Sequence, residues 1–537
     1  MSTAVMIIPA TSSERQSGFL MRIFIGSQNI ANCAQNLQKG FQELGHDAYV
    51  GLEETNRYYS SFAGDIALNS IRAAVRFQRQ PNGTTKVVPS PAFTTFVDSF
   101  DLFVFIASSS LLPRLVDLPL LSSMGKTIVA YQTGSEVRDP ALSKLFWTAY
   151  GHSYPFSYEK KPLYRHFFDL PLYLKSFNNL LYNTRMAEAF ATAICSSPAM
   201  STLAVRPYMS LQFPFTADGC RWRIPENDTL KVVHAPTSRK AKGTKTFFRI
   251  FQELKDEGVK FDLQLLENRP HHEVLAVLSD ADVLVDQLAC DCLGGLSFEG
   301  LASGCAVASG NCGSVPWPPD RPALSITPKT AKERIHRMLT DAPFRRSYAE
   351  RGKDWVDYYQ SPAVAAQAIL DALDREKTGR FDYYPVLFMQ KAQYIPKAPT
   401  PEFLQQMTVD ILLRHGLHPD ADIQRLILSK AISPATVKSL KAASRWAPDA
   451  MHKVGPWNWC GKHIPPPSFD PDMADWLEED EASRLADPCR ENTKGILGGM
   501  GRVRDSIRYC WDWYYRRKLK RAYAKRADVK AGACPNT

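Results

Sequence analysis

The chain has 537 residues, of which 45% are hydrophobic and 22% charged, the composition of an ordinary globular protein with two or three packed domains. It contains no apolar run near the roughly 18 residues that a membrane-spanning helix needs, so any membrane contact is expected to be peripheral. The net charge of +10 is concentrated near the C-terminus, which indicates a local partner for that segment.

Residues 1–20 predict a loose N-terminal extension rather than a secretory signal, because their short apolar patch follows no basic residue and has no long apolar core. The eleven cysteines are scattered, odd in number and form no Cys-x-x-Cys pair, which favours a reduced, cytoplasmic setting. Cys290 and Cys292 are one residue apart, a spacing that suits neither a zinc knuckle nor a redox pair. We assign no metal to them.

Residues 21–225 predict a first Rossmann-like domain. An apolar run at 21–26 is followed by a glycine loop, an amphipathic segment that stops at Gly45, and a second strand at 47–51. Further apolar strands are expected at 102–107, 127–131 and 191–195. The intervals between them are long enough for helical crossovers, so we expect a parallel sheet with helices on both faces.

The stretch 147–182 of this domain is dense in aromatic residues, with Lys160, Lys161 and Arg165 interleaved. Aromatic faces stack well on sugars, and they equally well pack an irregular insertion into a core. The sequence leaves both interpretations open and favours packing.

Residues 226–375 predict a second doubly wound α/β domain. Short β-rich runs at 230–235, 261–266, 282–287, 305–309 and 323–326 alternate with helical segments such as 244–257 and 271–278. Ligands of open α/β sheets bind beyond the carboxyl ends of the strands. We therefore expect the functional site in a cleft between the two domains.

Residues 376–500 predict a helical and irregular extension of unknown role, with one probable helix at 401–415. Residues 501–537 predict a basic amphipathic tail. Between Arg502 and Lys530 there are eleven Lys or Arg against three Asp, and an aromatic or aliphatic residue recurs every four positions. Such a helix suits an anionic membrane surface; a helix docked by its aromatic seam fits the same pattern, and nucleic acid is the less favoured partner.

Two segments of the second domain carry groups suited to a diphosphate. Gly294 and Gly295 precede a predicted helix whose free N–H groups and positive dipole end favour an anion. Glu299, one turn into that helix, is placed to accept hydrogen bonds from ribose hydroxyls. Upstream, Arg239 and Lys242 follow the first strand of the domain and supply cations for a departing diphosphate.

These residues resemble those of the retaining glycosyltransferases of family 4, which have the two-domain GT-B fold. The likeness lies in the Arg-x-x-Lys-Gly-Thr run from Arg239, the strand at 281–287 and the acid-x7-Glu loop from Asp291 to Glu299. It extends through the helices at 345–359 and, in the first half, through the loops at Gly26 and Gly134, so that it covers about residues 21–375.

The resemblance implies a role for each matching residue. Arg239 and Lys242 would neutralise the donor diphosphate, Glu299 would bind the ribose, and Asp291 would face the transferred sugar. Backbone groups of the glycine loop and the loops of the first domain would bind the donor, at Gly294, Gly295, Leu296, Ser297, Gly26 and Gly134. Two departures matter: Asp291 stands where many members have Glu, and Thr133 stands where many have His.

Two other motifs invite functional interpretations. Asp280-Ala-Asp282 is similar to the metal site of the other large transferase fold, but it precedes a strand instead of following one, and we assign no metal there. His271 and His272 open a predicted helix and are interpreted as a cap or surface pair rather than as metal ligands.

The sequence thus predicts a cytoplasmic, metal-independent retaining hexosyltransferase of polysaccharide biosynthesis. Its donor would be a nucleotide-diphosphate sugar and its acceptor a glycan or a lipid-linked glycan, with peripheral contact to the inner face of the membrane through residues 502–530. A GT-B nucleotide-sugar epimerase and a catalytically silent nucleotide-sugar-binding subunit remain as alternatives.

Overall fold

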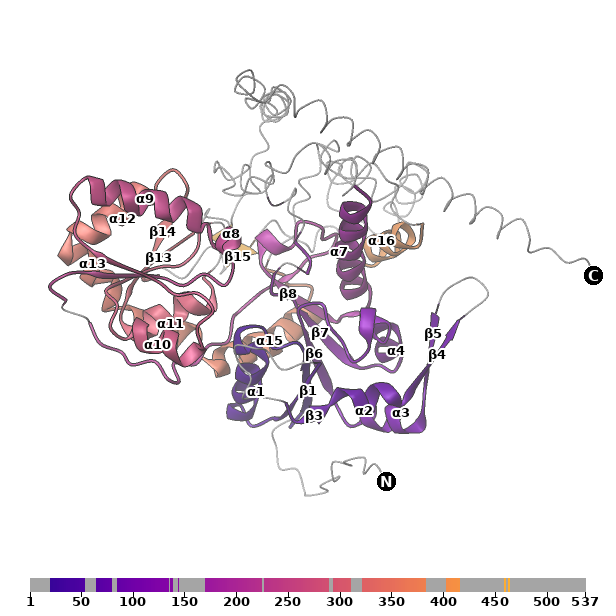
Figure 1. The fold of residues 1–537 in the computed structure, drawn as a ribbon. Helices are drawn as coiled ribbons and strands as arrows, with labels where there is room; N and C mark the ends of the chain where they lie inside the picture. The colour runs from indigo at the N-terminus through magenta and orange to yellow at the C-terminus, as the bar shows by residue number, and fades with distance from the viewer. Residues whose placement is uncertain are drawn as a thin grey trace, which may run out of the picture. The chain divides into compact units, whose positions relative to one another are not determined.

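The computed structural model describes residues 20–53, 64–79, 85–134, 136–138, 143, 170–224, 227–288, 293–310, 321–382, 402–415, 458–459 and 462–463 (Figure 1). Asp291, the aromatic stretch up to residue 169, most of the extension and the whole tail 501–537 lie outside these residues. Within the described part, no helix combines the length and the apolar character needed to cross a membrane.

The first sheet of the described residues has seven strands, all parallel, in the order β3-β2-β1-β6-β7-β8-β9. Their bounds are Ile66–Ala67 (β3), Asp47–Leu52 (β2), Arg22–Ser27 (β1), Leu102–Ile106 (β6), Thr127–Tyr131 (β7), Ala193–Ser196 (β8) and Met209–Ser210 (β9). From β1 the chain first adds β2 and β3 on one side of the sheet and then adds β6 to β9 on the other side, which is the strand order of doubly wound folds.

Apolar residues alternate between the two faces of this sheet, as strand geometry requires. One face packs Phe24, Phe103 and Ile128 against α3 (Pro91–Asp98), α4 (Leu118–Ser123) and α7 (Leu170–Phe190). The other face packs Ile23, Ile25 and Val104 against α1 (Cys33–Glu43). Shorter elements complete this half: α2 (Leu68–Ala73) and the antiparallel pair β4 (Val75–Arg79) and β5 (Thr85–Pro89).

The second sheet has five described strands, again all parallel, in the order β11-β10-β12-β13-β14. Their bounds are Asp262–Leu265 (β11), Lys231–His234 (β10), Val283–Val285 (β12), Ala306–Gly310 (β13) and Ala323–Ile326 (β14). The helices that follow are α8 (Arg239–Lys242), α9 (Thr244–Asp256), α10 (His271–Leu278), α11 (Gly295–Ser303), α12 (Ala331–Thr340), α13 (Ala342–Ala349) and α14 (Gly352–Tyr359).

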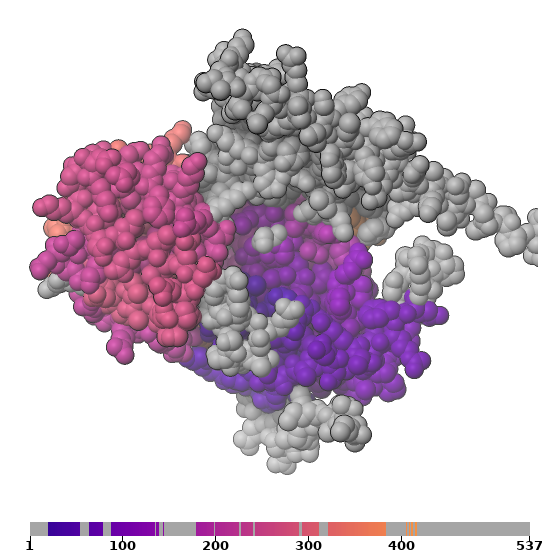
Figure 2. Space-filling model, viewed as in Figure 1, coloured from indigo at the N-terminus to yellow at the C-terminus, as the bar shows by residue number. Residues whose placement is uncertain are grey.

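In this second sheet too, neighbouring residues of one strand pack into helix layers on opposite faces of the sheet. Val232 packs in the layer of α9, α12 and α13, whereas Val233 packs in the layer of α10, α11 and α14. Figure 2 shows the surface of these elements in magenta and salmon. The predicted fold class, two doubly wound α/β domains, is confirmed.

Helix α15 (Pro362–Lys377) follows the second sheet in sequence but packs against the first. Its residues Ala365, Ala366 and Ile369 lie in one core with Leu37 and Phe41 of α1. The chain therefore returns to its first half after completing the second, although the predicted second domain runs in chain order to residue 375.

The helix expected at 401–415 is confirmed as α16 (Glu402–His415). It packs on α7, where the buried Arg185 donates from Nε to the Thr408 hydroxyl at 2.7 Å. The Arg185 guanidinium also forms an ion pair with the buried Glu188 at 2.6 Å. This part of the extension is thus held to the first domain by buried polar contacts. Two further described strands, β15 (Asn458–Trp459) and β16 (Lys462–His463), pair with each other.

Candidate active site

Three of the predicted donor residues, Lys242, Gly294 and Ser297, lie together beyond the carboxyl ends of β10 and β12, where doubly wound sheets bind ligands. Asp286, which directly follows β12, is fully buried and organises the group. Its carboxylate accepts from Lys242 Nζ at 2.6 Å and from the Ser297 hydroxyl at 2.5 Å. Lys242 Nζ also donates to Gln287 Oε1 at 3.0 Å. Lys242 and Ser297 are therefore brought together around the Asp286 carboxylate. The sequence indicated Asp286 only as part of the end of a strand.

Gly294 and Gly295 lie beside this cluster and begin helix α11. A Cβ placed on Gly294 would lie 3.7 Å from the Asp286 carboxylate and 3.8 Å from Lys242 Nζ. Gly294 is the N-cap residue and offers no side-chain hydrogen bond, so the amides of Gly295, Leu296 and the next residues point out of the helix end. The ammonium group and these amides thus face the same small region.

Glu299 lies one turn into α11, is largely buried, and accepts a hydrogen bond from His271 Nε2 at 2.8 Å. His271 is the first residue of α10, whose N-cap is Pro270. The interpretation of His271 as a cap or surface residue is therefore wrong, since its ring is half-buried and bonded to Glu299. Together with Gly295, the pair lines a pocket of about 140 Å³ that also includes Asn32 and Asn36 of the first half.

The His271–Glu299 pair predicts a pH-dependent stability. The hydrogen bond to Glu299 raises the pKa of His271 above its usual value. The charged pair therefore contributes fully to the free energy of unfolding below about pH 6.5, the pKa of histidine in the unfolded chain. That contribution is lost as the pH rises through the higher pKa of His271 in the folded protein. The melting-temperature gap between the wild type and His271→Asn should therefore be largest near pH 6 and shrink towards pH 8.5. His272→Asn, at an exposed neighbour, is the control; a gap that stays constant with pH contradicts the charged pair.

Arg239 lies apart from the Lys242 cluster. Its side chain is 60% exposed and forms a bidentate pair with Glu267, with Nε–Oε1 and Nη2–Oε2 distances of 2.7 and 2.5 Å. Lys242, by contrast, is 15% exposed. The Nε and Nη2 groups of Arg239 are therefore engaged by Glu267 and not by the Asp286 cluster.

The loop that presents Lys242 is fixed at both ends. His234, at the end of β10, donates from Nδ1 to the Val285 carbonyl at 2.7 Å, so that its Nε2 accepts from the Thr244 hydroxyl at 2.8 Å. Burial lowers the pKa of His234, which keeps the ring neutral. Gly243 has φ of +77°, and a Cβ there would lie 2.9 Å from Leu288 Cβ. Only glycine fits this position without strain.

The remaining predicted residues lie elsewhere. Gly26 is within β1, where a side chain would overlap the Gly51 carbonyl and the Phe24 ring, so packing alone requires a glycine there. Gly134 follows β7 and lines a separate pocket of the first domain. Asp291, between Leu288 and Leu293, is outside the described residues.

Asp280 and Asp282 take part in structural contacts. Asp280 pairs with Arg223 and Lys231, while Asp282 accepts from the Asn227 side chain at 2.8 Å and from the Lys231 amide at 2.8 Å. Among the described residues, no group of three or more His, Cys, Asp or Glu side chains is arranged to hold a metal ion.

No family model and no curated protein matches the chain. Several solved glycosyltransferase structures do. Sucrose-phosphate synthase from Thermosynechococcus elongatus is 13% identical, with 67% of this chain and 99% of that chain aligned at a TM-score of 0.40. An alpha-glucosyltransferase in complex with UDP and DNA is 14% identical, with 66% of this chain and 99% of that chain aligned at a TM-score of 0.41. WaaG, a glycosyltransferase involved in lipopolysaccharide biosynthesis, is 13% identical, with 65% of this chain and 99% of that chain aligned at a TM-score of 0.37. At TM-scores below 0.5, these matches carry no argument about function.

Proposed function

We propose that the protein is a retaining, metal-independent glycosyltransferase that moves a hexose from a nucleotide-diphosphate sugar to a hydroxyl of a glycan or lipid-linked acceptor. The observation that carries the proposal is the position of the Lys242 ammonium beside Gly294 and the start of α11, where the N-cap glycine has no side chain to bond the first amides. An ammonium has three N–H donors, and Asp286 and Gln287 accept two of them. No described residue accepts the third, which would bind a donor phosphate.

The Lys242 ammonium and the first amides of α11 are suited to stabilise a departing nucleoside diphosphate. As the bond between the anomeric carbon and the diphosphate oxygen breaks, negative charge grows on the diphosphate. A fixed ammonium and helix-start amides stabilise that charge without reorganising. The acceptor hydroxyl forms the new bond to the anomeric carbon from the same face and passes its proton to the departing diphosphate oxygen. This step depends on positioning more than on a strong base, which fits a site of cations and amides.

Thermal-shift measurements with a panel of nucleotide sugars would identify the donor, and release of nucleoside diphosphate with each acceptor would then test transfer. We expect release to continue in EDTA and the sugar to appear on the acceptor with its anomeric configuration retained. Activity lost in EDTA and restored by manganese would contradict metal independence. Donor binding without release would favour a silent binding subunit, and a sugar epimerised without transfer would favour an epimerase.

For the tail, which is outside the described residues, membrane association is a proposal from its charge and its amphipathic periodicity. Each basic residue near an anionic surface contributes about 1 kcal/mol, screened beyond a Debye length of about 8 Å at physiological salt. The full chain should sediment with anionic vesicles at low salt and less so at high salt, and deletion of 502–537 should abolish sedimentation while transfer to a soluble acceptor continues. Equal sedimentation of the truncated chain would contradict the proposal.

A further inference from the structure

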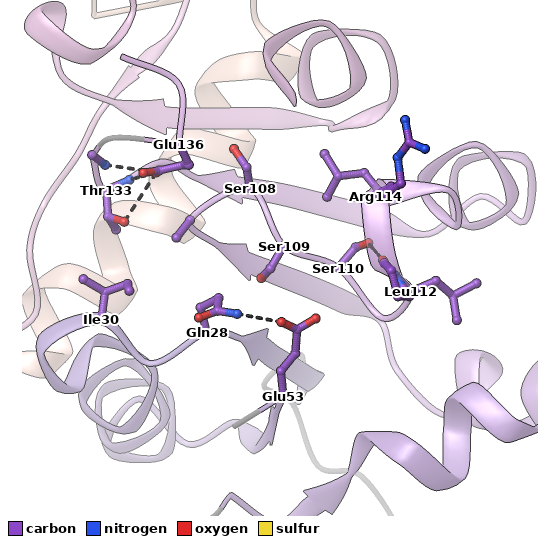
Figure 3. Close-up of a pocket in the computed structure, with 14 residues that line it drawn as sticks. Gln28, Ile30, Glu53, Ser108, Ser109, Ser110, Leu112, Arg114, Thr133 and Glu136 are labelled. Atoms are coloured by element: carbon purple, nitrogen blue, oxygen red, sulfur yellow. Dashed lines mark hydrogen bonds between the residues drawn. The ribbon is translucent and has the colours of Figure 1, made fainter. Parts of the chain in front are cut away.

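The second domain contains a pocket of about 430 Å³, and none of its lining residues belongs to the donor site. It is also separate from the first-domain pocket that Gly134 lines. That first-domain pocket is formed by the loops after β1, β2, β6 and β7, with Gln28, Glu53, Ser108 and Glu136 among its lining residues (Figure 3). The volume of the second-domain pocket is typical of a small-molecule site.

The second-domain pocket lies at the opposite end of its sheet from the Lys242 cluster. Asp282, one of its lining residues, directly precedes β12, and Asp286 directly follows that strand. Gly304, another lining residue, is the C-cap of α11, whose N-cap is Gly294. At the usual rise per residue, the strand and the helix each separate the two sites by about 13 Å. A ligand in this pocket is therefore expected to bind without touching the donor.

Asp282 offers one carboxylate oxygen to the pocket. Its side chain is buried, and its Oδ2 accepts from Asn227 Nδ2 and from the Lys231 backbone amide, both at 2.8 Å. Its Oδ1 has no hydrogen-bond partner among the described residues, and the cations Lys231 and Arg223 pair with Asp280 instead. An N–H or O–H group of a ligand that bonds to this oxygen would offset part of the cost of burying the carboxylate.

Arg345, on α13, offers a guanidinium to the same pocket. Its Nη1 donates to the carbonyls of Met338 at 3.1 Å and Leu339 at 3.4 Å, which fix the group at the end of α12. Within the described parts of the chain, its Nε and Nη2 have no hydrogen-bond partner and the guanidinium forms no ion pair. Burial lowers the pKa of Arg345, and the charge of Asp282 acts in the opposite direction. The guanidinium and the Asp282 carboxylate thus line one pocket without pairing with each other.

Most of the remaining wall is apolar. It is formed by residues with aliphatic side chains: Ile224, Leu230, Ala342, Pro343 and Ala349. Arg346 also lines the pocket, but its Nε pairs with Glu350 at 2.6 Å. A ligand that fits these surroundings needs an acceptor for Arg345, a donor for Asp282 and an apolar body.

We propose that this pocket binds a small carboxylic acid that carries an amino or hydroxyl group on the neighbouring carbon and an apolar side chain. Its carboxylate accepts from Arg345, and its amino or hydroxyl group donates to Asp282 Oδ1. An anion without a donor group is repelled by Asp282, and an amine without an acceptor group is repelled by Arg345. The site goes beyond the proposed transferase function and does not depend on it.

Four derivatives of one amino acid test both contacts. Leucine, 2-hydroxy-4-methylpentanoate, 4-methylpentanoate and leucinamide share an apolar body and differ only in their polar groups. They would be titrated into the full chain by saturation-transfer NMR, and the corresponding phenylalanine series covers a larger apolar body. In at least one series, the amino acid or its hydroxy analogue should bind about tenfold or more tightly than the derivative without a donor and the amide without a carboxylate. The comparison of amino acid with hydroxy acid then shows which donor group Asp282 prefers.

Two variants assign the contacts to the pocket. Arg345→Gln should abolish the preference for the amino or hydroxy acid over the amide, and Asp282→Asn should abolish the preference over the acid without a donor. Arg249→Gln, at an exposed position of α9, is the matched control and should change neither ratio.

Equal binding of all four derivatives in both series, binding of none of them, or ratios that stay unchanged in both pocket variants would overturn the proposal. The comparison among ligands uses the wild-type chain, so misfolding of a variant cannot hide the result. Because binding is measured directly, a failure of the proposed transferase function would leave this test intact.

Discussion

Replacing Lys242 by alanine is expected to lower the turnover of the nucleotide sugar by a factor of about 100 or more, the usual effect of losing one fixed donor to a developing charge. Lys242 is the described cation closest to Gly294, and its ammonium is held by the buried Asp286 and by Gln287. The measurement is the initial rate of nucleoside diphosphate release at saturating donor. A near-normal rate would refute the assignment of the site.

The control for this experiment must separate chemistry from folding, because Lys242→Ala leaves the buried Asp286 without its ion-pair partner. The double variant Lys242→Ala with Asp286→Asn removes that unpaired charge. If its melting temperature recovers while the rate stays low, the loss belongs to the reaction. Lys245→Ala, at an exposed position of α9, should have no effect. Arg239→Ala should cost less than Lys242→Ala because Arg239 is exposed and bound to Glu267.

Most strands of the two sheets could be predicted because they are short apolar runs, but β3 and β9, of two residues each, give no such signal and were missed. The return of α15 to the first domain could not be predicted either, since an apolar stripe such as Ala365, Ala366 and Ile369 fits either sheet equally well. The helix at 402–415 was likewise predictable in extent, but its docking on α7 through Thr408 depends on a buried arginine 223 positions earlier in the chain.

Part of the cluster around Asp286 was predictable, where its residues lie in local motifs. Lys242 precedes a glycine and a helix, and Gly294 begins another helix, so spacing alone indicates a phosphate site. The partners Asp286 and His271 carry no such signal, because each acts through a tertiary contact. The pocket of the first domain is a stronger case: Gln28, Glu53, Ser108 and Glu136 come from four separate loops. Only the strand order brings them together, whereas the sequence pattern points to the aromatic stretch 147–182.

The buried ionic cluster of the first domain predicts a large effect on stability. Glu188, on α7, is fully buried and accepts from Arg185 at 2.6 Å and from the Val205 amide at 2.6 Å. Arg206, also buried, donates to the carbonyl of Glu188 at 3.1 Å and pairs with Glu376 of α15 at 2.8 Å. Helices α7, α15 and α16 are thus connected through arginines that have no access to water.

Glu188→Ala should lower the free energy of unfolding by about 3–5 kcal/mol, because removal of one partner leaves a buried guanidinium uncompensated. Urea denaturation followed by circular dichroism measures the change. Glu350→Ala is the matched control: Glu350 pairs with Arg346 at 2.6 Å, but both side chains are about half exposed, and such a pair contributes about 1 kcal/mol or less. If Glu188→Ala costs no more than Glu350→Ala, the arginines must reach water or other acceptors. The cluster would then not be what holds α16 to the first domain. A loss of the expected size, together with faster proteolysis within 402–415, would show that this part of the extension belongs to the folded core.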